Sequence, residues 1–211
     1  MKLFRELRCL IMKHNVITPP IVDTDIWVYL ILSGYYKRII EYYGYLQFSD
    51  VVEREIMNWQ KNTQEFSEIA NKFSELKAKG NVKIIQFDSF DSLDQASINH
   101  TLSEFGLKEV GILEKNKGEF TSLLYALHKD IHRFKTNDRK FKVEVEDFID
   151  EDFTFVNWTN ILDNYSKSFN EKIQSKKLVD SKQLKMKQQN ETYKKEKQDP
   201  RWDKLKELIK E

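Results

Sequence analysis

The chain has 211 residues, which suits one domain of ordinary size with an extension and is long enough for a hydrophobic core. The net charge of +1 shows that the whole chain is no polycation, but residues 167–211 hold fourteen Lys and Arg against eight Asp and Glu. The single cysteine, Cys9, excludes an intrachain disulfide and a cysteine-based zinc site, and it indicates a reducing compartment. Basic residues interrupt the apolar N-terminus, so we expect neither a secretory signal nor a membrane span, and a cytoplasmic location.

The first 80 residues predict one strand among helices. In chain order we expect a short helix within residues 1–18 stopped by Pro19, a brief buried strand at 20–23, a helix at 26–43 stopped by Gly44, and a helix at 50–79 capped by Ser49 and stopped by Gly80. The strand is expected to be covered on both faces because its apolar residues run continuously.

The rest of the chain continues the alternation. We expect a strand at 82–87, a helix at 89–107, a helix at 119–129 opened by Lys117 and Gly118, and strands at 131–136 and 153–158. Strands that alternate with helices predict an α/β domain with a mostly parallel sheet. The expected layout is an N-terminal segment at 1–19, a domain at 20–166, and a lysine-rich extension at 167–211 that is helical or partly disordered. Within the extension, residues 202–209 have the spacing of a short amphipathic helix.

Four short stretches carry acids where elements begin or end. They are Ile21-Val22-Asp23-Thr24-Asp25, Val51-Val52-Glu53-Arg54-Glu55-Ile56, Lys117-Gly118-Glu119 and Thr136-Asn137-Asp138-Arg139. Ligands of α/β proteins bind at the carboxyl ends of the strands, the edge that also holds helix N-termini. Mg²⁺ and Mn²⁺ prefer carboxylate oxygens, and a cation removes the repulsion between crowded acids. The pattern therefore favours a metal-dependent hydrolase of phosphodiesters.

The same stretches resemble those of PIN-domain nucleases over residues 20–163. In that family an Asp ends the first strand, as Asp23 does here, and a Glu precedes an apolar residue early in a helix, as in Glu55-Ile56. The Gly118-Glu119 pair and the Thr136-Asn137-Asp138-Arg139 segment are similar to the two remaining motifs, and residues 157–162 resemble the closing strand and helix. The resemblance implies a three-layer α/β/α fold with a mostly parallel central sheet, to which the basic helical extension is added.

The resemblance also implies an activity. The expected protein is an endoribonuclease whose catalytic residues are Asp23, Glu55, Glu119 and Asp138. Its metal ligands for Mg²⁺ or Mn²⁺ would be Asp23, Asp25, Glu119 and Asp138. The VapC-type toxins of toxin–antitoxin pairs are the nearest functional analogy, which implies RNA as substrate, a protein antitoxin and a homodimer. RNA processing and phage defence fit the residues as well.

Other interpretations of the same residues stay open at the level of sequence. Asp23 suits an N-cap of the helix that begins at Ile26, but Asp25 is the preferred cap. Glu53 competes with Glu55. Glu55 and Glu119 are expected in the first turns of their helices, where Glu119 complements the helix N-terminus, and Asp138 suits a turn. Arg139, Lys140 and Lys142 suit phosphate contacts or a solvated loop. The basic extension suits RNA or partner binding, or a solvated face. The alternative functions are a non-catalytic PIN-like module that binds RNA or protein, and a nuclease acting on DNA.

Overall fold

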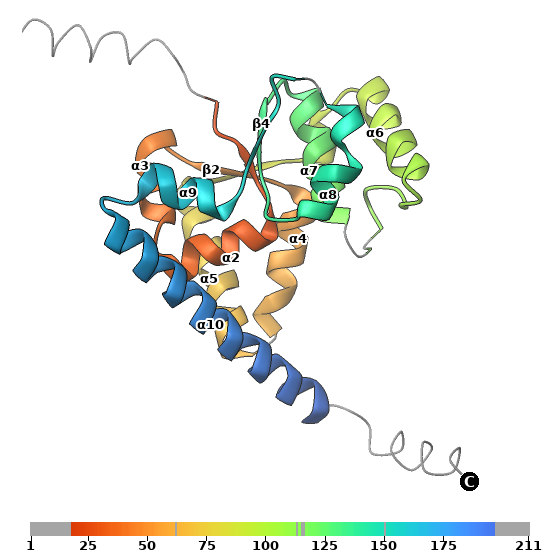
Figure 1. Ribbon diagram of the computed structural model, residues 1–211. Helices are drawn as coiled ribbons and strands as arrows, with labels where there is room; N and C mark the ends of the chain where they lie inside the picture. Colours follow the sequence, from red (N-terminus) through yellow and green to blue (C-terminus); the bar gives the residue numbers. More distant parts are fainter. Residues whose placement is uncertain (1–17, 62, 113, 115–116, 150, 197–211) are drawn as a thin grey trace, which may run out of the picture.

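The computed structural model describes residues 18–61, 63–112, 114, 117–149 and 151–196, and its centre is one parallel sheet (Figure 1). Its strands are β1 (Ile21–Val22), β2 (Leu46–Ser49), β3 (Val82–Ile85), β4 (Arg133–Lys135) and β5 (Thr154–Val156). Their order across the sheet is β3-β2-β1-β4-β5, and every neighbouring pair is parallel. The predicted α/β class with a parallel sheet is confirmed.

Helices cover both faces of the sheet (Figure 1). One apolar cluster joins Val22 to α2 (Thr24–Ser33), α3 (Tyr36–Tyr43), α5 (Gln64–Ala78), α9 (Trp158–Tyr165) and α10 (Phe169–Glu196). The other joins Ile21 to α6 (Ser92–Glu104), α7 (Lys117–His128) and α8 (Arg139–Glu144). Helix α4 (Asp50–Asn58) contributes to both clusters. Ile21 and Val22 face opposite ways because side chains alternate along a strand. The arrangement is consistent with three layers, α/β/α.

Two helices that we predicted as continuous are interrupted. Gly34 ends α2 in the left-handed conformation with φ 81°, so the predicted helix at 26–43 is two helices, although its stop at Gly44 is confirmed. The predicted helix at 50–79 is likewise broken, by η1 (Trp59–Lys61), between α4 and α5. Its cap is confirmed, since Ser49 accepts the N–H of Val52. The prediction of one helix was wrong in both places.

The other predicted elements that fall within the described residues are confirmed with shifted ends, but strand β2 and helix α8 were not predicted. The short 3₁₀ turn η2 (Phe87–Ser89) precedes α6, and the turn η3 (Glu146–Phe148) follows α8. Strand β2 was not predicted at all: it has four residues, Leu46 to Ser49, and lies buried between β1 and β3. The predicted helices within residues 1–18 and at 202–209 lie outside the described residues. Within those residues, no helix is both long and apolar enough to cross a membrane.

Helix α10 packs against the domain along much of its length. It runs beside α2 (Figure 1), and the side chains of Val179 and Met186 are 1% and 4% exposed. Nearby, Arg38 pairs with Glu171 at 2.6 Å, and Ser175 donates a hydrogen bond to the hydroxyl of Tyr35. The part of the extension that the structure describes therefore completes the core, and the boundary predicted at residue 167 does not separate two independent packing units.

The connection order places a switch point beside β1. The chain leaves β1 toward β2 and β3 on one side of the sheet, and β4 and β5 lie on the other side. In open parallel sheets, ligands bind outside the carboxyl ends of the strands at such a point. Asp23 follows β1 directly, and the segment from Thr136 to Asp138 follows β4.

Candidate functional site

Asp23 lies at the centre of the site and is buried, with 2% of its surface exposed. It is the N-cap of α2, and its Oδ1 accepts the N–H of Thr24 at 2.7 Å. Thr136, at the end of β4, donates its hydroxyl to Asp23 Oδ2 at 3.4 Å. The expectation that Asp25 is the likelier cap was wrong, because α2 begins at Thr24 rather than at residue 26.

Glu55 reaches the same place from α4. The hydroxyl of Thr24 donates to Glu55 Oε2 at 2.7 Å, which ties α4 to the start of α2. Glu53 points elsewhere, because it forms an ion pair with Lys77 of α5. The structure therefore places Glu55, and not Glu53, with the other acids. Glu55 lies in the second turn of α4, so the expectation of a first-turn position was wrong for it.

Helix α7 brings its N-terminus against these acids. A Cβ atom at Gly118 would lie 3.4 Å from Glu55 Oε2 and 4.0 Å from Asp23 Oδ1, so the glycine lets the helix approach both carboxylates. Glu119 lies in the first turn of α7, as predicted. The buried Lys117 holds this end of the helix, because its ammonium donates to the carbonyls of Glu109 and Ile112.

Asp25 and Asp138 occupy the other side of the strand ends. Asp25 Oδ2 accepts the N–H of Asn137 at 3.2 Å, and its Oδ1 is buried without a hydrogen-bond partner in the described part of the chain. Asp138 is exposed and caps α8, accepting the N–H groups of Lys140 and Phe141 through Oδ1. Asp138 therefore caps a helix beside the site.

Four of the five predicted acids line one cavity of about 490 Å³. Its lining consists of the acids Asp23, Asp25, Glu55 and Glu119, with Thr24, Val28, Trp59, Phe66, Gln183, Met186, Lys187 and Asn190. Asp138 is not in this lining, but its charge acts on Asp25 and Glu119. Residues distant in sequence are thus gathered at the carboxyl edge of the sheet.

Burial and mutual repulsion make these acids hard to ionise. Burial raises the pKa of Asp23 well above its usual range, and the charges of Asp25 and Glu119 raise it further. Burial likewise raises the pKa of Asp25 to about 6, although backbone N–H groups oppose the shift. The pKa of Glu119 is raised by burial and then by the charge of Glu55. A bound cation would lower all three values because it favours the ionised forms.

The oxygen-rich side chains are of the type that binds a divalent cation, although their carboxylate oxygens do not converge on one position. Among the described residues, no group of three or more His, Cys, Asp or Glu side chains forms a ready metal-binding set. Sharing one ion needs a side-chain rotation, which the long Glu55 and Glu119 side chains permit. Mg²⁺ or Mn²⁺ prefers such hard oxygen ligands, and it would give a partner to the buried Oδ1 of Asp25, which has none among the residues that the structure describes.

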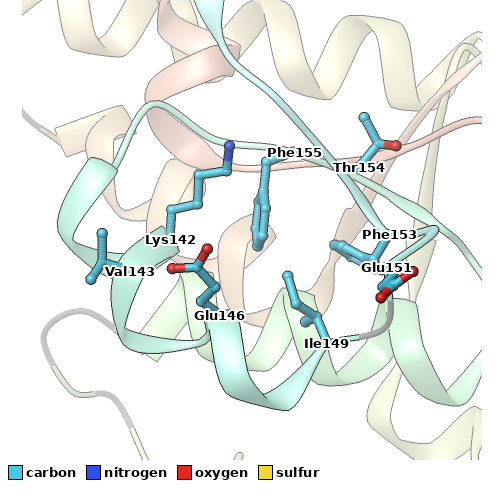
Figure 2. A pocket seen from close by; sticks show the side chains of 8 residues that line it. All are labelled: Lys142, Val143, Glu146, Ile149, Glu151, Phe153, Thr154 and Phe155. Carbon is cyan, nitrogen blue, oxygen red and sulfur yellow. The ribbon is translucent and has the colours of Figure 1, made fainter.

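The predicted nucleic-acid contacts are divided between two surfaces. Arg139 and Lys140 are exposed in the first turn of α8, next to Asp138. Lys142 instead lines a separate pocket of about 560 Å³ (Figure 2), with its ammonium 5.4 Å from the centre of the Phe155 ring. The other residues of that pocket are Val143, Glu146, Ile149, Glu151, Phe153 and Thr154. The structure therefore does not place Lys142 in the lining of the acidic cavity, and phosphate contacts of the other two stay a prediction.

Several residues of the site were not predicted from the sequence. Thr24 and Thr136 hold carboxylates in place, and both lie inside motifs that we identified only by their acids. Trp59 and Phe66 lie at the helix break that we did not expect. The side chains from α10 had no local signal, because they belong to a segment that is nearly all polar.

Comparison of the chain with models of protein families, with curated proteins and with solved structures found no match. The geometry of the site itself is therefore the basis for the functional proposal.

Proposed function

We propose that the protein is a metal-dependent endoribonuclease of PIN type, which hydrolyses RNA phosphodiesters in the acidic cavity. The observation that carries the proposal is the gathering of Asp23, Asp25, Glu55 and Glu119 from three distant segments into one cavity, at the switch point of a parallel sheet. A structural role alone does not account for this, since crowded buried carboxylates destabilise a fold at neutral pH unless a cation or a proton neutralises them.

The protein residues have distinct tasks in this proposal. Asp23, Asp25 and Glu119, with Asp138 beside them, would hold Mg²⁺ or Mn²⁺. The ion, when bound, supplies an activated water and neutralises charge on the phosphate. Thr24 fixes Glu55 through its hydroxyl, and Thr136 fixes Asp23. Glu55 is the exposed member of the cavity acids, so solvent and a bound RNA can reach its carboxyl group.

A cleavage assay tests this proposal. Single-stranded RNA and single-stranded DNA are incubated with the full chain in Mg²⁺, Mn²⁺ or chelator. We expect internal cleavage of RNA that the chelator abolishes and that Asp23→Asn abolishes without loss of folding. Cleavage of DNA alone would replace the substrate, whereas binding of RNA without cleavage in either metal would make the protein a non-catalytic module. A toxin role with an antitoxin, and a homodimer, stay predictions.

A further inference from the structure

The cavity that holds the carboxylates also has an aromatic wall. Trp59 of η1 and Phe66 of α5 both line it, with ring centroids 5.2 Å apart and planes at 77°. Both side chains are half-buried, so part of each ring stays accessible. Val28 and Met186 make the nearby lining apolar as well. An accessible aromatic ring beside a phosphate-processing site suits a nucleobase, because every base has a face that can stack on such a ring.

The facing side chains of α10 supply hydrogen-bonding groups. Gln183 and Asn190 are seven residues apart, so they lie on one face of the helix, with Met186 between them. Both are half-buried in the cavity lining, and neither side chain has a hydrogen-bond partner within the residues that the structure describes. An amide group offers a donor and an acceptor together, as the edge of a nucleobase requires. Lys187, on the same wall, adds a positive charge that suits a phosphate.

We propose that this cavity is a nucleobase subsite, in which one unpaired base stacks on Trp59 while Gln183 and Asn190 contact its edge. The inference rests on the proposed nuclease function, because the base belongs to the nucleotide whose phosphate faces the carboxylates. The volume of about 490 Å³ lies within the range of roughly 300–1,000 Å³ that small-molecule sites occupy. Helix α10 is then a wall of the substrate site as well as part of the core.

Binding of mononucleotides tests the subsite without any cleavage. The four ribonucleoside 5′-monophosphates and ribose 5-phosphate are titrated calorimetrically into the full chain in Mn²⁺. Since these probes share the phosphate and differ in the base, we expect at least one monophosphate to bind about 5- to 100-fold more tightly than ribose 5-phosphate. Trp59→Ala should abolish that difference. Phe169→Ala, which removes an aromatic side chain that is 73% exposed on α10, should leave it intact.

A second pair of variants covers the risk that Trp59→Ala disturbs packing against Phe66. The double variant Gln183→Ala, Asn190→Ala keeps α10 helical, because Ala is the strongest helix former. We expect it to narrow the spread of affinities among the four monophosphates, whereas Gln189→Ala, at an exposed position of the same helix, should not. Equal affinity of the folded parent for ribose 5-phosphate and all monophosphates would overturn the subsite. The subsite would also be overturned if neither Trp59→Ala nor the double variant changed the spread of affinities among the monophosphates.

The two proposals fail in different ways. Base-dependent binding that requires Trp59, in a protein that cuts neither RNA nor DNA, would retain the subsite and reject the nuclease. Metal-dependent cleavage with monophosphate affinities that do not depend on the base would retain the nuclease and reject the subsite.

Discussion

Asp23 caps helix α2 with the same carboxyl group that lines the acidic cavity. Its Oδ1 accepts the N–H of Thr24 while its Oδ2 receives the hydroxyl of Thr136. A cap and a metal ligand are therefore compatible roles for one residue, because an ionised carboxylate has about four acceptor positions. Asp138 caps α8 through Oδ1 alone, which accepts both capping N–H groups, so the cap does not use its Oδ2.

Asp25 should make folding stability depend on pH in the absence of metal. Its pKa is about 6 in the folded protein against an ordinary value of 3.8, so the folded state binds the proton more tightly. The tighter proton binding stabilises the folded state below about pH 4, and this stabilisation is lost as the pH rises through 6. At pH 7 in chelator, Asp25→Asn should therefore be more stable than the parent, by up to about 3 kcal/mol. At pH 4 the difference should vanish.

Urea unfolding of the two proteins between pH 4 and pH 8 measures this difference. If the parent is as stable as Asp25→Asn at every pH, then ionised Asp25 does not destabilise the folded state, and the prediction is wrong.

Divalent metal should raise the melting temperature through the same acids. At 100 times its dissociation constant, a ligand adds roughly 2.7 kcal/mol, which for a chain of this size raises Tm by about 5–10 °C. Thermal unfolding in Mn²⁺ and in chelator gives the shift. Asp23→Asn should abolish it, and Glu53→Gln, whose carboxylate pairs with Lys77, should retain it. An identical Tm in saturating Mn²⁺ and chelator would reject the metal site.

At the scale of elements, local signals predicted most helices and strands, and the exceptions have physical reasons. Four of the five strands were predicted because short stretches rich in β-branched, aromatic or other apolar residues lie between turn or cap signals. Strand β2 was not, although Leu46-Gln47-Phe48-Ser49 alternates apolar and polar residues, because it has only four residues and the last of them was assigned as a helix cap. The break at Gly34 was missed because glycine is tolerated inside a helical pattern, and only its φ of 81° shows that it ends α2.

Helix α10 should contribute to stability through one face only. Met186 is 4% exposed in the core, whereas Leu184, two residues earlier, is 58% exposed. Met186→Ala should cost about 2–5 kcal/mol, because it removes buried surface and leaves a cavity. Leu184→Ala should stay within about 0.5 kcal/mol. Denaturant unfolding of the two variants makes the comparison, and equal small losses would mean that α10 is not docked in solution as it is in the structure.

At the scale of the whole molecule, the acids of the site were predictable and its walls were not. Asp23, Asp138 and Glu119 follow strand ends or open a helix, so the topology of a parallel sheet brings them to one edge. The choice of Glu55 over Glu53 needed the structure, because both residues lie on the same helix and only their partners differ. The contribution of Gln183 and Asn190 depends on how α10 docks across α2, a long-range contact without a local sequence signal.

Helix α4 offers the most direct test of the claim that the gathered acids form a nuclease site. Glu55 and Glu53 are two residues apart on it, and Glu→Gln removes the charge from either with little change in volume. In Mn²⁺ with single-stranded RNA, we expect Glu55→Gln to lower the cleavage rate about 100-fold or more. Glu53→Gln should cleave at nearly the parent rate, since its carboxylate contacts Lys77 outside the cavity. Cleavage by Glu55→Gln at the parent rate, or equal losses in both folded variants, would contradict the account.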